Sequence, residues 1–223
     1  MMRITHETYS QVFGTVYLAL MTNLLLVVSG LPFVLTLVST DPVRAWPVLA
    51  VLAPLAAPGV TAAFCVYRAF SAEGTVRVAR TFVRAWRATF RRAFTVGAMV
   101  SAALVVLGVD VRATWTTTVG AVAIPVFVGL GVLAFAVGVV GLVAVAERPD
   151  ARLRDLLKAS LYLAVRRWYL TAVSLTTLGV LAGIVAARPA IGFGLAAAPL
   201  LYVVWANSQF ALRPVLDRQP TAV

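Results

Sequence analysis

The sequence predicts an all-α integral membrane protein with six transmembrane helices and two cytoplasmic amphipathic helices at the membrane interface. Its composition is the first indication: 61% of the 223 residues are hydrophobic and 12% are charged, whereas a soluble domain carries about 25% charged residues. The second is that apolar runs of roughly 20 residues, enough to cross a bilayer, recur along the chain. We therefore expect residues 1–223 to form a single polytopic membrane domain.

The apolar runs define six expected spans, at about residues 12–38, 47–70, 93–109, 117–146, 169–187 and 191–212. The first run is longer than the apolar region of a signal peptide, and no clear cleavage site follows it, so we expect it to be retained. The third is short, and Arg91 and Arg92 can extend from its end to the membrane surface.

The placement of the basic residues predicts the orientation of these spans. Six crossings put both termini on one side, and sixteen of the 19 Lys and Arg residues fall on that side. The other side receives Arg44, Arg112 and Arg188. Basic loops stay in the cytoplasm, so the N- and C-termini are predicted to be cytoplasmic. We interpret the net charge of +11 as a feature that attracts the protein to the anionic lipids of the inner leaflet. No nucleic acid is expected as a partner.

An amphipathic helix is predicted at about residues 76–92. Arginines recur there at steps of three and four, which places them on one side of a helix, whereas apolar and aromatic residues fall on the opposite side. The basic side suits phosphate headgroups, so we expect contact with anionic lipid or a partner through Arg77, Arg80, Arg84, Arg87, Arg91 and the neighbouring Trp86. The alternative is a loop that sets the topology and happens to be helical.

A second amphipathic helix is predicted at about residues 150–167. Its apolar stripe is expected to comprise Leu156, Leu157, Leu161 and Val165, and Arg166 and Arg167 are further candidates for lipid or partner contact. The stretch "VRRWY" in this segment matches "FRRAF" in the first, 75 residues earlier. This match suggests a duplication that gives two parallel hairpins. Alternatively, the same charge rule shaped both loops.

Three positions inside the spans are candidates for a functional role. Asn23 and Asn207 carry amides, which we expect to form hydrogen bonds between helices, with a contact to substrate as the alternative. Pro58 interrupts the second span and is expected to kink it, either as a purely structural feature or at a cavity or hinge.

The groups that catalysis or cofactor binding would need are missing from the pattern. His6 and Cys65 are the single histidine and the single cysteine, too few for a His/Cys metal cluster. The acidic residues fall in predicted loops or at helix ends, and there is no phosphate-binding loop. We therefore expect no enzyme activity, no cofactor, and no catalytic or metal-binding residues.

Three stretches resemble the YesL-like family of bacterial integral membrane proteins, a family of unknown function. They are "NLLLVVSGLP" from Asn23, "APGVTAAFCVYRAFSAEG" from Ala57 and "FVRAWRATFRRAF" from Phe82, and the resemblance covers roughly residues 9–109. Val27 and Ala57 depart from the family's pattern, which has an aromatic residue and a Gly-Pro pair near these places.

The resemblance implies a six-span protein of the bacterial plasma membrane. Its association with carbohydrate uptake systems implies an accessory or regulatory role with a transporter subunit as partner. The alternative function is a small permease with a polar pocket in the middle of the membrane, and a membrane enzyme is a third. A polar cavity near Asn23, Pro58 and Asn207 would favour the permease, and an interior packed with Gly and Ala would favour the accessory role.

Overall fold

The structure is a computed structural model that describes residues 6–216, with side chains described over residues 13–212. All regular elements in this range are helical. They are α1 (His6–Ser29), α2 (Leu31–Ser39), α3 (Trp46–Glu73), α4 (Val78–Thr114), α5 (Gly120–Glu147), α6 (Leu153–Arg166), α7 (Trp168–Ala187), α8 (Pro189–Ile191), the π-helical segment η1 (Gly192–Ala196) and α9 (Ala197–Leu216).

The architecture is that of an all-α membrane protein, as predicted. Within the described residues, five helices are long and apolar enough to cross a membrane, and a sixth crossing results if α1 and α2 are counted together as one bent span. The bounds of α3, α5 and α7 agree closely with the predicted second, fourth and fifth spans.

The prediction of a separate interfacial helix followed by a short span is wrong for α4. Residues 78–114 form one continuous helix of 37 residues, which is about 55 Å long at 1.5 Å per residue. The chain changes from basic to apolar near Ala93, but it contains no glycine or proline between Val78 and Val96. A change in polarity does not end a helix when no residue interrupts its backbone. The basic segment is therefore the N-terminal half of α4.

The first and last spans are not simple helices. The chain bends by 83° between α1 and α2, where Pro32 lies in the first turn of α2 and has no N–H to continue the hydrogen-bond pattern of α1. Near the other end of the chain, α8 leads into η1 and then α9. Pro199 follows η1 closely, and a π-helical turn is one way in which a helix accommodates a lost backbone donor.

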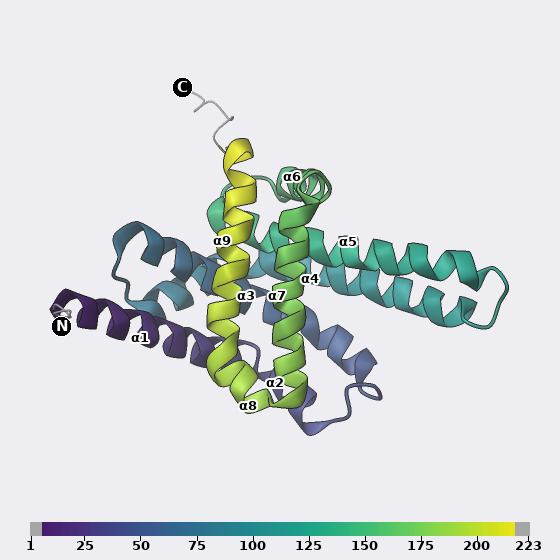
Figure 1. The fold of residues 1–223 in the computed structure, drawn as a ribbon, viewed down its shortest axis with the longest axis horizontal. Helices are drawn as coiled ribbons and strands as arrows, with labels where there is room; N and C mark the ends of the chain where they lie inside the picture. The colour runs from purple at the N-terminus through teal and green to yellow at the C-terminus, as the bar shows by residue number, and fades with distance from the viewer. Residues whose placement is uncertain (1–5, 217–223) are drawn as a thin grey trace, which may run out of the picture.

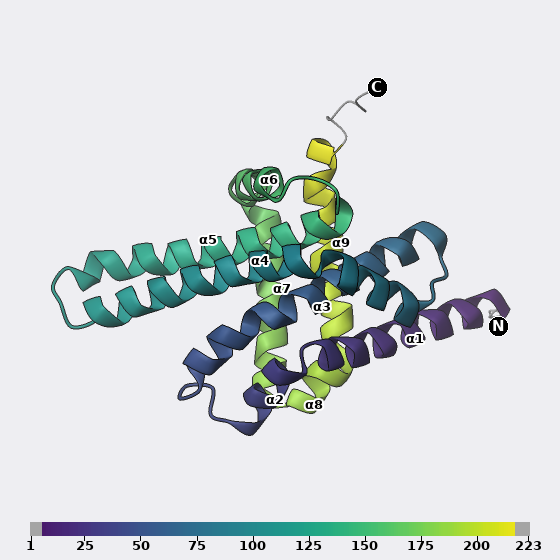
Figure 2. The same ribbon diagram turned by 180° about the vertical axis from the view of Figure 1, so that it is seen from behind.

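The helices form two pairs that cross each other. Figure 1 shows the α4–α5 hairpin running across the α7–α9 pair, and Figure 2 shows the same crossing from behind. The start of α1, the α3–α4 turn, α6 and the end of α9 lie toward the left and top of Figure 1. The α2–α3 loop, the α4–α5 loop and α8 lie toward the right and bottom. The two pairs therefore point in different directions, and their connecting loops lie at different edges of the molecule (Figure 1).

The predicted pair of equivalent hairpins is not seen in this arrangement. α3 packs along α4, whereas α5 packs on α4 and α7 packs on α9. The counterpart of the continuous α4 is also divided, because α6 ends at Arg166 and α7 begins at Trp168. The matching "RR" pairs therefore stand in different settings.

The core lies where α3 meets α4, α5 and α9. Ala62, Ala63 and Val66 of α3 are fully buried, and the hydroxyl of buried Tyr67 donates to the carbonyl oxygen of Ala198 at 3.0 Å. Small residues allow close contact between α3 and α4: a Cβ added at Gly97 of α4 would lie 2.8 Å from Ala57 Cβ and 3.1 Å from Pro54 Cα. Such close approach of backbones is how membrane helices gain packing energy without a hydrophobic driving force.

Candidate functional site

The basic face of α4 is the most distinctive charged surface in the described part of the chain. Its five arginines, Arg77, Arg80, Arg84, Arg87 and Arg91, are all exposed. On the opposite face Phe82 is 3% exposed, and Ala79, Trp86 and Phe90 are half-buried. Val83, one of the apolar residues that the spacing places opposite the arginines, is 41% exposed, because it lies at the boundary between the two faces. Apart from Val83, the predicted separation of faces is confirmed.

Three of these arginines line a groove at the α3–α4 turn. Gly74 allows the turn because its φ of 70° lies in the left-handed region. The groove has a volume of about 590 Å³, and its charged lining consists of Glu73, Arg77, Arg80 and Arg84. No salt bridge joins Glu73 to these arginines among the described side chains. The groove therefore carries a net positive charge and suits a phosphate or carboxylate group.

Arg166 and Arg167, on the second amphipathic segment, are partly occupied by contacts within the protein. Arg166 donates to the hydroxyl of Tyr162 and lies over its ring, at 5.5 Å from the centroid. Arg167 donates to the carbonyl oxygen of Phe210 at 3.2 Å and lies over that ring as well. The contact of Arg166 lies within α6, whereas that of Arg167 links the end of α6 to α9, so the two arginines differ in role from those of α4.

The apolar stripe predicted for α6 is only partly correct. Leu156 is buried and Leu157 half-buried, but Leu161 and Val165 are 47% and 58% exposed. The buried face instead comprises Leu156, Ser160, Leu163 and Ala164. Ser160 can be buried here because its hydroxyl donates to the carbonyl oxygen of Leu156 at 2.8 Å, so a polar residue occupies a core position that hydrophobic patterning assigns elsewhere.

The amide of Asn23 connects α1 to the start of α9. Its Nδ2 donates to the carbonyl oxygen of Gly194 at 2.8 Å, and its Oδ1 accepts from the N–H of Ala198 at 2.6 Å. Asn23 is 2% exposed. In a π-helical register the carbonyl of Gly194 would pair with residue 199, which is a proline and has no N–H. Asn23 thus supplies the hydrogen bonds that this irregular turn needs.

Asn207 also contacts a neighbouring helix, and Pro58 lies in the buried part of α3. Asn207 Nδ2 donates to the carbonyl oxygen of Leu170 at 2.6 Å and to the hydroxyl of Ser174 at 2.7 Å, so it links α9 to α7. Pro58 is buried within α3. The expectation of hydrogen bonds between helices is therefore confirmed for both amides. The structure does not bring Asn23, Pro58 and Asn207 together at a common pocket.

A partly open pocket at the helix crossing is apolar. It has a volume of about 270 Å³, and its lining includes Leu26, Gly30, Phe64, Phe135 and Phe193 but no side chain with a nitrogen or oxygen atom. Asn23, Pro58 and Asn207 do not line it. A polar substrate would find no hydrogen-bond partner among these side chains.

A polar cluster at the end of α5 was not predicted. Arg68 of α3 donates through one nitrogen to the carbonyl oxygens of Ala146 and Glu147, the latter at 2.9 Å. The buried Trp205 of α9 donates from Nε1 to Glu147 Oε1 at 3.0 Å. The cluster joins three helices and places a cation at a helix C-terminus, where it is stabilising. The sequence signal for this cluster was that Arg68 and Glu147 each stand at the end of an apolar run.

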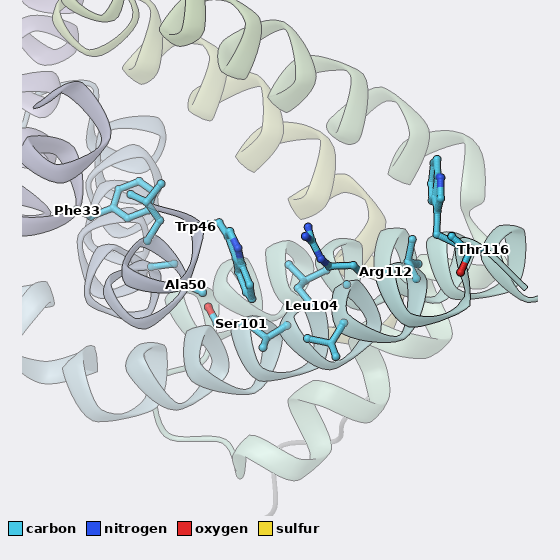
Figure 3. Close-up of a pocket in the computed structure, with 14 residues that line it drawn as sticks. Phe33, Trp46, Ala50, Ser101, Leu104, Arg112 and Thr116 are labelled. Atoms are coloured by element: carbon cyan, nitrogen blue, oxygen red, sulfur yellow. The ribbon is translucent and has the colours of Figure 1, made fainter. Parts of the chain in front are cut away.

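A second groove lies at the far end of α4 from the basic face. It has a volume of about 890 Å³ and is bordered by Phe33 of α2, by the start of α3 and by residues 101–116 at the end of α4. Figure 3 shows Trp46 and Arg112 extending into its open side, with Ser101 and Leu104 along α4 beneath. Trp46 and Trp115 are 46% and 69% exposed.

No described group of three or more His, Cys, Asp or Glu residues is arranged to hold a metal ion. The chain matches no protein-family model, no curated protein and no solved structure. The resemblance to the YesL-like family therefore stays a prediction.

Proposed function

We propose that the protein is a non-enzymatic, multi-pass membrane protein with an accessory role, bound at the inner leaflet to anionic lipid headgroups. The observation that carries this proposal is the groove at the α3–α4 turn, where Arg77, Arg80 and Arg84 stand against the single carboxylate of Glu73. Arginine side chains in a fixed groove can hold a phosphate through several charge-assisted hydrogen bonds.

The orientation follows from the distribution of charge. Counted over six crossings, most of the Lys and Arg residues fall on one side, and these include the residues of the basic groove and of α6. We place this side in the cytoplasm of a bacterial cell, with both termini there as well. Arg3, Arg213 and Arg218, which contribute to the count, lie outside the residues whose side chains are described.

The packing of the interior favours an accessory role over a permease. The amides that could have faced a substrate are bound to neighbouring helices, and the pocket at the crossing has an apolar lining. Close contacts through Gly97 and Ala57 hold α3 against α4. A transporter subunit, of the kind that serves carbohydrate uptake, is the partner we propose for the cytoplasmic side.

Lipid retention by the purified full-length protein tests the groove. Arg77, Arg80 and Arg84 would be changed together to Gln, and retention of phosphatidylglycerol against phosphatidylcholine measured by native mass spectrometry. At about 1 kcal/mol for each basic residue near an anionic surface, the triple variant should lose about 3 kcal/mol, or roughly 150-fold in affinity.

The matched control changes Arg152, Arg154 and Lys158, three exposed residues of the α6 segment. Their replacement removes the same amount of charge as the triple variant in the groove. We expect a much smaller loss for this variant. Equal losses in the two variants would mean that charge acts diffusely and that the groove is not a site.

The accessory role has its own test. Cross-linking in native membranes should recover the membrane subunit of a transporter, whereas sugar flux in proteoliposomes that contain this protein alone would establish the permease instead.

A further inference from the structure

We propose that the groove between α2, α3 and the C-terminal part of α4 binds one anionic phospholipid, with its phosphate at Arg112 and an acyl chain along α4. The site is separate from the basic groove described above, because the two lie at opposite ends of α4. It depends on the membrane location of the chain but not on the accessory role.

The groove changes in polarity along its length. Its rim carries Arg112, Thr116 and the two tryptophans Trp46 and Trp115, whereas its inner part is lined by residues such as Ala50, Ala53, Leu104 and Val105. Tryptophan is enriched at the headgroup level of membranes, and small and aliphatic side chains suit an acyl chain. Head and tail of a lipid would thus each meet matching side chains.

The dimensions of the groove agree with those of one leaflet. Arg112 and Ser101 both line it and both belong to α4, and eleven helical steps separate them by about 16 Å. Half of a hydrocarbon core of roughly 30 Å is about 15 Å. A lipid with its phosphate at Arg112 would therefore extend its chain to about the depth of Ser101, near the middle of the membrane.

The charge at the rim favours an anionic headgroup. Arg112 is exposed, and among the described side chains it forms no salt bridge. Asp110, the nearest acid along the chain, does not line the groove. Figure 3 shows the Arg112 side chain directed into the open side of the groove, where a phosphate can approach it.

Two variants test the two ends of the site in the full-length protein. Arg112→Gln removes the charge at the rim, and Gly108→Leu fills the inner part. A Cβ added at Gly108 meets nothing within 4 Å although this residue lines the groove, so the helix should form normally. The matched controls are Arg188→Gln and Gly129→Leu. Gly129 also has open space at its Cβ, and neither residue lines this groove.

Native mass spectrometry of protein released from nanodiscs measures the result, with phosphatidylglycerol and phosphatidylcholine as probes. We expect the wild-type protein to retain one phosphatidylglycerol in preference to phosphatidylcholine. Arg112→Gln should reduce that preference about tenfold, since a lost charge-assisted contact is worth about that much. Gly108→Leu should lose the retained lipid, and both controls should behave as wild type.

The proposal is wrong if Arg112→Gln and Gly108→Leu retain phosphatidylglycerol as the wild type does. It is also wrong if Gly108→Leu converts a dimer into a monomer in light scattering, because the groove would then hold a helix of a second copy. The triple arginine variant at the α3–α4 turn should leave the Gly108-sensitive lipid in place, so failure of one lipid site does not imply failure of the other.

Discussion

Replacing Asn23 by Leu should destabilise the protein more than any other single removal of an amide. Leucine has the same number and branching of side-chain heavy atoms, so the change removes two hydrogen bonds without opening a cavity. It leaves the carbonyl oxygen of Gly194 and the N–H of Ala198 without the partners they have at 2.8 and 2.6 Å. Each unpaired buried group costs about 1–3 kcal/mol, although hydrogen bonds between membrane helices average about 0.6 kcal/mol.

We expect a loss of about 2–4 kcal/mol for Asn23→Leu, because Pro199 prevents the backbone from closing the gap with a hydrogen bond of its own. For a chain of this size the loss corresponds to a fall in Tm of roughly 5–15 °C. Thermal unfolding in detergent, followed by circular dichroism, measures it. Gln209→Leu is the control, since Gln209 is half-buried on α9 and has no hydrogen bond within the described residues.

A second substitution tests the reason for the loss. Pro199→Ala restores a backbone N–H at the position where the helix lacks one, so it should recover part of the stability of Asn23→Leu and have less effect in the wild-type chain. If Asn23→Leu stays within about 0.5 kcal/mol of wild type, or if Pro199→Ala has the same effect in both backgrounds, Asn23 does not compensate for Pro199.

Two further substitutions give outcomes of opposite sign. Gly97→Leu should lower the free energy of unfolding by about 1–3 kcal/mol, since its Cβ would lie 3.1 Å from the Cα of Pro54 and the backbone of α3 must move. Gly129→Leu, the control, has open space at its Cβ and should lower it almost not at all. Equal Tm values for the two variants would contradict the close packing of α3 on α4. Trp86→Phe should leave Tm unchanged or raise it by about 1–3 °C. The Nε1 of Trp86 is buried without a hydrogen-bond partner, so removing this N–H gains stability that offsets the loss of contact area. A large fall in Tm would show that this N–H has a partner.

The sequence was sufficient to predict the fold class because hydropathy and charge act over whole segments. The bounds of α3, α5 and α7 followed from their apolar runs. The polarity pattern also predicted correctly that Arg77, Arg80 and Arg84 share an exposed face. These properties depend on the composition of a segment and not on its neighbours.

The length of α4 and the specific partners of helices were not predicted. The change in polarity near Ala93 was interpreted as a helix boundary, although the backbone of α4 has no reason to break there. The sequence could not show that Asn23 compensates for the missing N–H of Pro199, since 175 positions separate Asn23 from its partner Ala198. The crossing of the α4–α5 hairpin over the α7–α9 pair (Figure 2) likewise depends on which small residues meet.

Labelling of single cysteines in intact cells tests the central claim, that the basic end of α4 is cytoplasmic and its other end faces outward. Cys65 is buried, and changing it to Ala leaves a background without thiols. Ser71→Cys and Thr118→Cys, both at exposed positions near opposite ends of α4, would then be treated with a membrane-impermeant maleimide. We expect residue 118 to be labelled in intact cells and residue 71 only after lysis. Labelling of residue 71 in intact cells would place the basic end of α4 outside the cell.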